Sequence, residues 1–256
     1  MKIFKPFETD ISRTTINLIS LGWFIFILSI WLICGTGTTH LFPTPPQVLN
    51  GFVDLYNNGL VVHIVSSVWL CTKSVIISIT ICLTICYASP LPILSPISRF
   101  ISKFRYLPLT GISFYIAILI NDARSIQVWV LVVFMTTFLT TSLLSMIEDI
   151  SPEEKDHARS LGCSRWEMLW EVLIKGRLDY VLELIRQNLA IVWMFVVSVE
   201  SILVAAGGLG FLIKNNDKLG DSGKVVAIQI IIIFIGITLD FTITKLRRLI
   251  FRYSNF

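Results

Sequence analysis

The chain has 256 residues, of which 54% are hydrophobic and 15% are charged. Soluble domains carry about 25% charged residues, so this composition and a mean hydropathy of +0.77 exclude an ordinary soluble domain. The apolar residues gather in long runs, which is typical of a membrane protein. We predict a single all-α integral membrane domain over residues 1–256.

Six runs are expected to cross the bilayer, because a crossing helix needs about 20 residues. They lie at about 16–34, 64–87, 100–120, 126–147, 188–206 and 225–243. The first run has 19 residues and no cleavage pattern after it, so we expect a span and not a signal peptide. The third is the weakest: its core Leu107–Ile120 contains Pro108 and Gly111, so it must extend backwards, bend or re-enter. The segment Gln47–Leu55 is expected to form an interfacial helix.

The distribution of Lys and Arg predicts the orientation of these spans. With the N-terminus in the cytoplasm, sixteen of the 21 Lys and Arg residues fall on the cytoplasmic side, four fall outside and Lys73 lies in the membrane. Positive residues favour the cytoplasmic side, so both termini are predicted to be cytoplasmic. The net charge of +4 follows from this bias and implies no nucleic-acid partner.

The polar segment 151–187 separates the fourth and fifth predicted spans. Ser151 followed by Pro152 predicts one helix start, and Ser164 predicts another. Gly162 lies between them, where a helix end favours a residue that tolerates a positive φ. We therefore predict a cytoplasmic helix–Gly–helix hairpin, whose second helix is amphipathic and lies along the membrane base.

The hairpin resembles a known motif. The run Asp156–Arg165 is similar to the EAA motif of permease subunits in binding-protein-dependent ABC importers, with Asp156, His157 and Ala158 in the triplet and Gly162 as its glycine. The order of residues after the triplet resembles the nitrate, taurine and aliphatic-sulfonate branch. Two further segments resemble elements of that branch: Leu41–Leu49, and Glu200 followed by Gly208–Ile213.

The sequence also departs from the family pattern. Lys175 and Asp179 stand where the family usually has prolines, the acid of the triplet is Asp, and its first alanine is replaced by His157. These departures imply a docking geometry of its own or a specialised partner.

The resemblance implies a permease subunit that works with a second permease subunit, a cytoplasmic ABC ATPase and an extracytoplasmic substrate-binding protein in the bacterial inner membrane. It implies a small solute, such as nitrate, taurine or another small anion. The chain has no G-x-x-x-x-G-K-[ST] loop, so a partner must hydrolyse ATP, and we expect neither an enzyme nor a cofactor. By the same resemblance, the ATPase-coupling residues are Glu153, Asp156, His157, Ala158, Arg159, Gly162 and Arg165.

Charges within predicted spans are candidates for the solute pathway. Lys73 and Glu200 either pair with each other, contact an anionic substrate, or act structurally, with Lys73 snorkelling and Glu200 fixing the loop that follows it. Asp240 is expected to pair with Lys245 or Arg247.

Three alternatives account for parts of the sequence. A six-span channel or ion-driven transporter needs more polar residues within its spans than this chain supplies. A membrane-embedded enzyme is disfavoured because H-E-x-x-H and G-x-S-x-G are absent. A permease-like scaffold without transport is consistent with the missing prolines. Cys82 and Cys86 are predicted to share a helix face, but no His or carboxylate accompanies them, so we expect no metal site.

Overall fold

The computed structural model describes residues 13–35 and 43–251, and all the regular structure within these ranges is helical. The helices are α1 (Arg13–Gly35), α2 (Pro45–Asn57), α3 (Leu60–Ala88), α4 (Ser95–Lys103), η2 (Phe104–Tyr106), α5 (Leu109–Leu119), α6 (Ala123–Glu148), α7 (Pro152–Ser160), α8 (Arg165–Met168), η3 (Leu169–Lys175), α9 (Leu178–Ile202), η4 (Val204–Ala206), α10 (Leu209–Lys218) and α11 (Ser222–Ile250).

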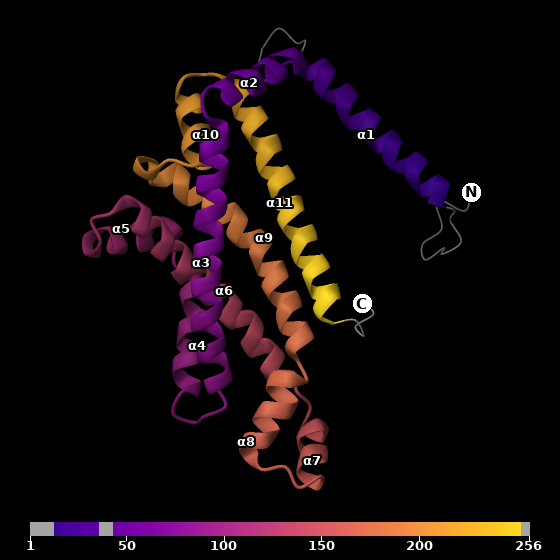
Figure 1. Cartoon of the computed structure of the whole chain (residues 1–256), viewed down its shortest axis with the longest axis vertical. Helices are drawn as coiled ribbons and strands as arrows, with labels where there is room; N and C mark the ends of the chain where they lie inside the picture. Colours follow the sequence, from indigo (N-terminus) through magenta and orange to yellow (C-terminus); the bar gives the residue numbers. More distant parts are fainter. Residues whose placement is uncertain (1–12, 36–42, 252–256) are drawn as a thin grey trace.

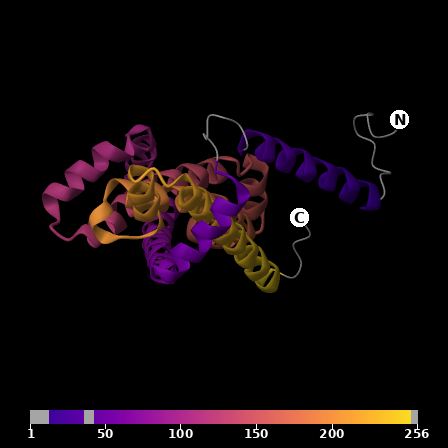
Figure 2. The same cartoon turned by 90° about the horizontal axis from the view of Figure 1, so that it is seen from above.

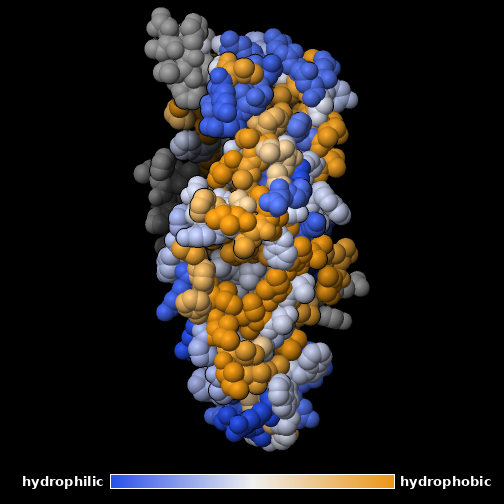
Figure 3. Space-filling view, turned by 90° about the vertical axis from the view of Figure 1, so that its left-hand side faces the viewer, coloured by the Kyte–Doolittle hydropathy of each residue, from blue (hydrophilic) through white to orange (hydrophobic). Residues whose placement is uncertain are grey.

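The long helices α3, α6, α9 and α11 form a bundle, with α2 and α10 at one end and α7 and α8 at the other (Figure 1). The helix α1 leaves the body beside α2 and lies apart from the bundle in both views (Figures 1 and 2), and none of its apolar stretch is buried. On the face shown in Figure 3, hydrophilic residues gather at the two ends, and hydrophobic residues dominate between them with some hydrophilic residues interspersed. This distribution is the one that a bilayer requires.

Within residues 13–35 and 43–251, five helices are long and apolar enough to cross a membrane: α1, α3, α6, α9 and α11. The third predicted span, 100–120, is divided into α4, η2 and α5, which agrees with the bend that the sequence offered as one alternative and not with a straight helix. The break lies at Leu107 and Pro108, where both residues have extended backbones. Proline disfavours the helical conformation of the residue before it and supplies no N–H of its own, so the helix stops and restarts.

The buried face of α3 is smaller and more polar than its exposed face. Its buried positions recur every three or four residues and include Ser67, Cys71, Ser74, Ser78, Cys82 and Cys86. The large side chains Val65, Trp69 and Ile76 are exposed instead. Small residues allow the backbones of neighbouring helices to approach closely in a membrane, so α3 packs its small face against α6 and turns its bulky face outward.

At the α2 end, two glycines bring α2 and α11 into contact. A Cβ on Gly51 would lie 3.1 Å from backbone atoms of Gly223, and Gly51 is buried. Lys224 lies 3.4 Å from Asp54 across the same contact. The interfacial helix expected at Gln47–Leu55 is part of α2.

Candidate functional site

The helix α7 projects from the end of the bundle. The Ser151 hydroxyl accepts a hydrogen bond from the Glu154 N–H at 3.2 Å, and Pro152 occupies the first turn, as the sequence predicts. Every residue of α7 except Ala158 is exposed. A polar helix that makes so few contacts within its own subunit is available to a partner.

Gly162 reverses the chain between α7 and α8. Its φ is +82°, and an added Cβ would meet nothing within 4 Å. The Gly162 N–H donates to Arg159 O at 2.9 Å, and the Cys163 N–H donates to Ala158 O at 3.2 Å. These two bonds are the Schellman pattern, which satisfies the last carbonyls of a helix and places a left-handed residue after it. The glycine is therefore required by backbone conformation and not by local crowding.

A capping box starts α8. The Ser164 hydroxyl accepts from the Glu167 N–H at 3.3 Å, while the Ser164 N–H donates to the Glu167 carboxylate at 2.7 Å. The backbone hydrogen bond from Ser164, assisted by its side chain, holds the pKa of Glu167 below its usual value. A lowered pKa means that this contribution to stability is present at neutral pH and is lost as the pH falls through the folded-state pKa.

The amphipathic helix continues from α8 as the π-helix η3, which the sequence did not predict. It ends at Gly176, where an added Cβ would lie 2.7 Å from Val172 O. Lys175, one of the residues that replace the family prolines, lies 2.7 Å from the Glu171 carboxylate and 5.8 Å from the Trp170 ring centre. This ion pair and cation–π contact close the helix end.

The structure places the predicted coupling residues on α7 and at the start of α8. Asp156 and Arg159 form an exposed ion pair at 3.1 Å, and Ala158 is buried at the base of the turn. The remaining three side-chain candidates are also exposed: Glu153, His157 and Arg165. The exposed set offers charges of both signs around one turn.

Two further features of the hairpin were missed by the sequence prediction. Leu161 is 70% exposed at the tip of the turn, which is unusual for a large apolar side chain beside a polar helix. Arg177 donates to both carboxylate oxygens of Glu154 at 2.7 and 2.8 Å, which ties the start of α7 to the residue before α9. The exposure of Leu161 could have been suspected from its place next to Gly162, at the turn. The Glu154–Arg177 pair could not, because no local pattern predicts a contact between residues 23 positions apart.

The Glu154–Arg177 pair is expected to stabilise the hairpin modestly, because both side chains are partly exposed. In a double-mutant cycle with Glu154→Gln and Arg177→Gln, we expect a coupling energy of about 0.5 kcal/mol. The cycle is measured on the free energy of unfolding of the chain in detergent. A matched cycle on Asp156 and Arg159, which lie within one helix, is the control. Strictly additive effects at Glu154 and Arg177 would show that the bidentate pair does not hold the hairpin.

Glu200 lies at the centre of a buried polar cluster near the other end of the bundle. Its carboxylate accepts from the Ser67 hydroxyl at 2.7 Å and from the Gly210 N–H at 3.0 Å. It lies 4.0 Å from the Arg124 guanidinium. Arg124 also donates to the Ser66 hydroxyl and, at 2.7 Å, to Ala206 O. The carboxylate thus fixes the chain around residues 206–210, which is the loop-fixing role that the sequence offered as one alternative.

The glycines of the G-L-G element make this cluster possible. A Cβ on Gly208 would overlap the Glu200 carboxylate, and a Cβ on Gly210 would overlap Val197 O. The Gly208 N–H donates to His63 Nδ1 at 3.2 Å, and the Leu209 N–H donates to the Ser67 hydroxyl at 2.9 Å. Backbone donors therefore approach Glu200 only because these positions carry no side chain.

Lys73 and Glu200 do not meet. Lys73 is exposed on α3, whereas Glu200 is completely buried. The pairing between them that the sequence allowed is therefore wrong.

Asp240 pairs with Arg186 on α9 at 2.5 Å, and not with Lys245 or Arg247 as predicted. Arg247 instead forms a bidentate contact with Asp179 at 2.7 and 3.1 Å. These ion pairs join the polar start of α9 to the end of α11. The helix α9 begins at Leu178, so residues that the sequence assigned to the hairpin form the first turns of this helix, ahead of the predicted span at 188–206.

A model of the family "Binding-protein-dependent transport system inner membrane component" matches residues 23–252. The chain belongs to this family. It is therefore a multi-pass permease component of an ABC importer in the inner membrane, and a transport subunit, not itself an enzyme.

Similar proteins agree with this assignment. The permease is 28% identical over 150 residues to the taurine transport system permease protein TauC of Escherichia coli (strain K12), an alignment that covers 59% of this chain and 52% of TauC. It is also 28% identical over 113 residues to a sequence from Methanocaldococcus jannaschii described as an ABC transporter permease protein, covering 43% of this chain and 42% of that protein. The chain thus aligns with about half of these relatives or less.

Solved structures show the same fold. The MetNI methionine ABC transporter in an inward-facing conformation matches with a TM-score of 0.64 and 14% identity, covering 74% of this chain and 95% of that chain. An amino acid ABC transporter crystallised with histidines matches with a TM-score of 0.61 and 19% identity, covering 79% and 97%.

Proposed function

We propose that this permease forms one half of a solute pathway and is driven by a cytoplasmic ABC ATPase that binds α7. The observation that supports the proposal best is the exposure of every α7 residue except Ala158. Because α7 is capped and held by the turn at Gly162, a movement of the bound ATPase would displace α7 as a unit and so shift the helices of the bundle. Glu153, Asp156, His157 and Arg159 contact the ATPase in this proposal. Ala158 and Gly162 shape the turn, and Arg165 supports it from the start of α8 without touching the ATPase.

The proposed orientation places α7 and both termini in the cytoplasm, as the Lys and Arg bias predicts. The termini themselves, residues 1–12 and 252–256, lie outside the described residues. The chain crosses the membrane six times in this proposal, with α4 and α5 as a third crossing broken at Pro108. A second permease subunit completes the pathway in this proposal, and a substrate-binding protein docks at the end that carries α2 and α10. The family-like segment Leu41–Leu49 lies at this end, but its first two residues fall outside the described residues.

We further propose a small anion as the solute. TauC is named a taurine transport permease, and Lys73 is an exposed cation within a predicted span. A cation at membrane depth is costly and is retained for a partner or a function. Glu200 is engaged by Ser67 and Gly210, so its role is to position the loop, and Lys73 is the residue that contacts the solute.

Uptake of labelled taurine and nitrate in a deletion strain of the host tests this proposal. The wild-type gene is expected to restore uptake of at least one of the two anions, and Lys73→Met is expected to reduce it at least tenfold. Lys73→Arg keeps the positive charge and is expected to restore most of the activity. Full uptake by Lys73→Met would remove Lys73 from the pathway, and no uptake with the wild-type gene would overturn the anion proposal.

A further inference from the structure

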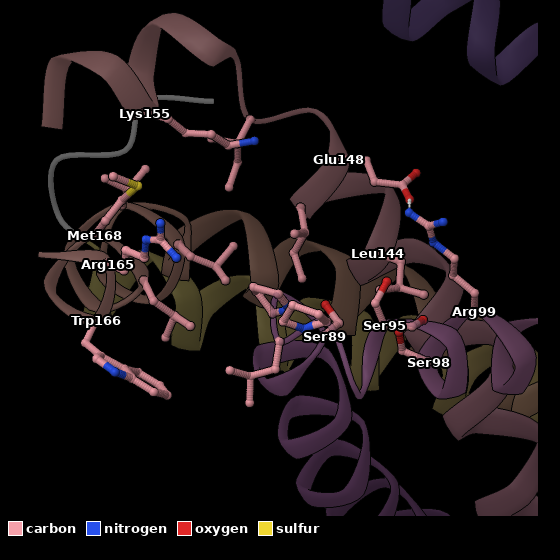
Figure 4. A pocket seen from close by; sticks show the side chains of 18 residues that line it. Ser89, Ser95, Ser98, Arg99, Leu144, Glu148, Lys155, Arg165, Trp166 and Met168 are labelled. Carbon is pink, nitrogen blue, oxygen red and sulfur yellow. Dashed lines mark hydrogen bonds and ion pairs between the residues drawn. The ribbon is translucent and has the colours of Figure 1, made fainter. Parts of the chain in front are cut away.

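A groove of about 740 Å³ lies where three parts of the chain meet: the turn after α3, the end of α6, and the hairpin formed by α7, α8 and η3 (Figure 4). Most of its lining side chains are apolar, among them Leu91, Leu144, Leu169 and Val172. Its volume falls within the range of small-molecule sites, roughly 300–1,000 Å³. The groove is therefore large enough for a ligand with a substantial apolar part.

The rim of the groove is positively charged. Lys155 and Arg165 lie on one side of it and Arg99 on the other (Figure 4). Glu148 is the one acid in the lining, and it lies 3.7 Å from Arg99. Neither Lys155 nor Arg165 has an ion-pair partner within residues 13–35 and 43–251. Two cations are thus left for an anionic ligand.

The ends of two candidate spans place the groove at the boundary of the hydrocarbon layer in the orientation proposed above. It opens where the candidate spans α3 and α6 end, at Ala88 and Glu148. Trp166, on the same rim, is 68% exposed. Tryptophan is enriched at headgroup level, and basic pockets between helices on the cytoplasmic side bind anionic headgroups. The apolar wall and the cationic rim therefore meet at the depth of a phospholipid phosphate.

We propose that this groove binds an anionic phospholipid of the cytoplasmic leaflet, with its phosphate on Lys155 and Arg165 and its acyl chains on the apolar wall. The inference rests on the orientation given under the proposed function. A free phosphate would use only the rim and leave the apolar wall in contact with water, which the hydrophobic effect disfavours. A bound lipid joins α6 and the turn after α3 to the hairpin, so it steadies the element that binds the ATPase.

Native mass spectrometry of the full transporter, purified from nanodiscs containing phosphatidylglycerol and phosphatidylcholine, tests the proposal. We expect phosphatidylglycerol to be retained by wild type and about tenfold less by the double variant Lys155→Gln and Arg165→Gln. The double variant Lys245→Gln and Arg248→Gln removes two cations of the C-terminal helix, which do not line the groove, and is expected to retain the lipid as wild type does.

Three results would overturn the proposal. One is equal lipid retention by the groove variant and the control variant. The second is complete displacement of the lipid by millimolar inorganic phosphate, which would make this a phosphate site. The third is cross-linking of Lys155 to an ATPase carboxylate in a complex without bound lipid. Loss of lipid while the ATPase stays bound would distinguish this proposal from failure of the proposed function.

Discussion

Gly162→Trp is expected to reduce ATP-driven uptake at least tenfold and to release the ATPase, while the subunit stays folded. The φ of +82° costs a side chain about 1–2 kcal/mol, which distorts the turn that projects α7. The indole then stands on the exposed tip that we propose as the ATPase-binding site. An added Cβ at Gly162 would meet no atom within 4 Å, so the substitution is expected to weaken ATPase binding without disturbing the packing of the bundle. Co-purification and uptake measure the effect.

Gly220→Trp is the matched control. Gly220 is also exposed, has a φ of +71° and meets nothing within 4 Å of an added Cβ, but it lies after α10 at the opposite end. It carries the same conformational penalty and is expected to retain the ATPase. Gly162→Ala, which adds the strain without the bulk, is expected to fall between wild type and Gly162→Trp. ATPase retention by Gly162→Trp at the wild-type level would contradict the role of this turn.

Gly210→Ala is expected to destabilise the membrane domain by about 3 kcal/mol or more. Its Cβ would overlap Val197 O and lie 2.8 Å from Ser201 N. These atoms belong to the backbone of α9 and cannot move aside, and overpacking of this kind is strongly destabilising. The amount of folded protein in membranes and its thermal unfolding in detergent measure the effect. Gly111→Ala, whose Cβ meets only Pro108 at 3.5 Å, is the control and is expected to be neutral or slightly stabilising.

Variants at Glu200 test the same cluster from its centre. Glu200→Ala leaves the Ser67 hydroxyl and the Gly210 N–H without an acceptor, at about 1–3 kcal/mol for each buried group. Glu200→Gln keeps an acceptor oxygen and loses only the attraction to Arg124, so it is expected to be the milder change. If Glu200→Ala left stability unchanged and abolished uptake, Glu200 would belong to the solute pathway after all.

Local chemistry made the hairpin predictable from sequence. Ser151, Gly162 and Ser164 occupy the cap positions expected of them, because capping depends only on residues within a few positions along the chain. Five of the six predicted spans were also recognisable from their length and hydrophobicity, and each overlaps a helix of the described residues that is long and apolar enough to cross a membrane. Pro108 signalled a break in the third predicted span. The sequence did not predict that the segment would divide into α4, η2 and α5.

The ion-pair partners of charges on different helices were not predictable in this way. Glu200 lies 76 residues from Arg124 and 54 residues separate Arg186 from Asp240, so both pairs depend on how the helices pack. Sequence proximity favoured Lys245 or Arg247 as the partner of Asp240. The positions of Lys73 and Glu200 within predicted spans made a pair between them one of the alternatives. The structure instead buries Glu200 against the loop that follows its own helix. In each case the ion-pair partner is set by the packing of the helices and not by the distance along the sequence.

The most direct test of the central proposal is gentle detergent purification of the tagged chain from its native host, followed by mass spectrometry and an ATPase assay. The proposal predicts a co-purifying P-loop ATPase, a second permease subunit, and hydrolysis that is lost when residues 153–161 are deleted. A complex that contains no ATPase and still moves solute would contradict it and would favour a channel or an ion-driven transporter.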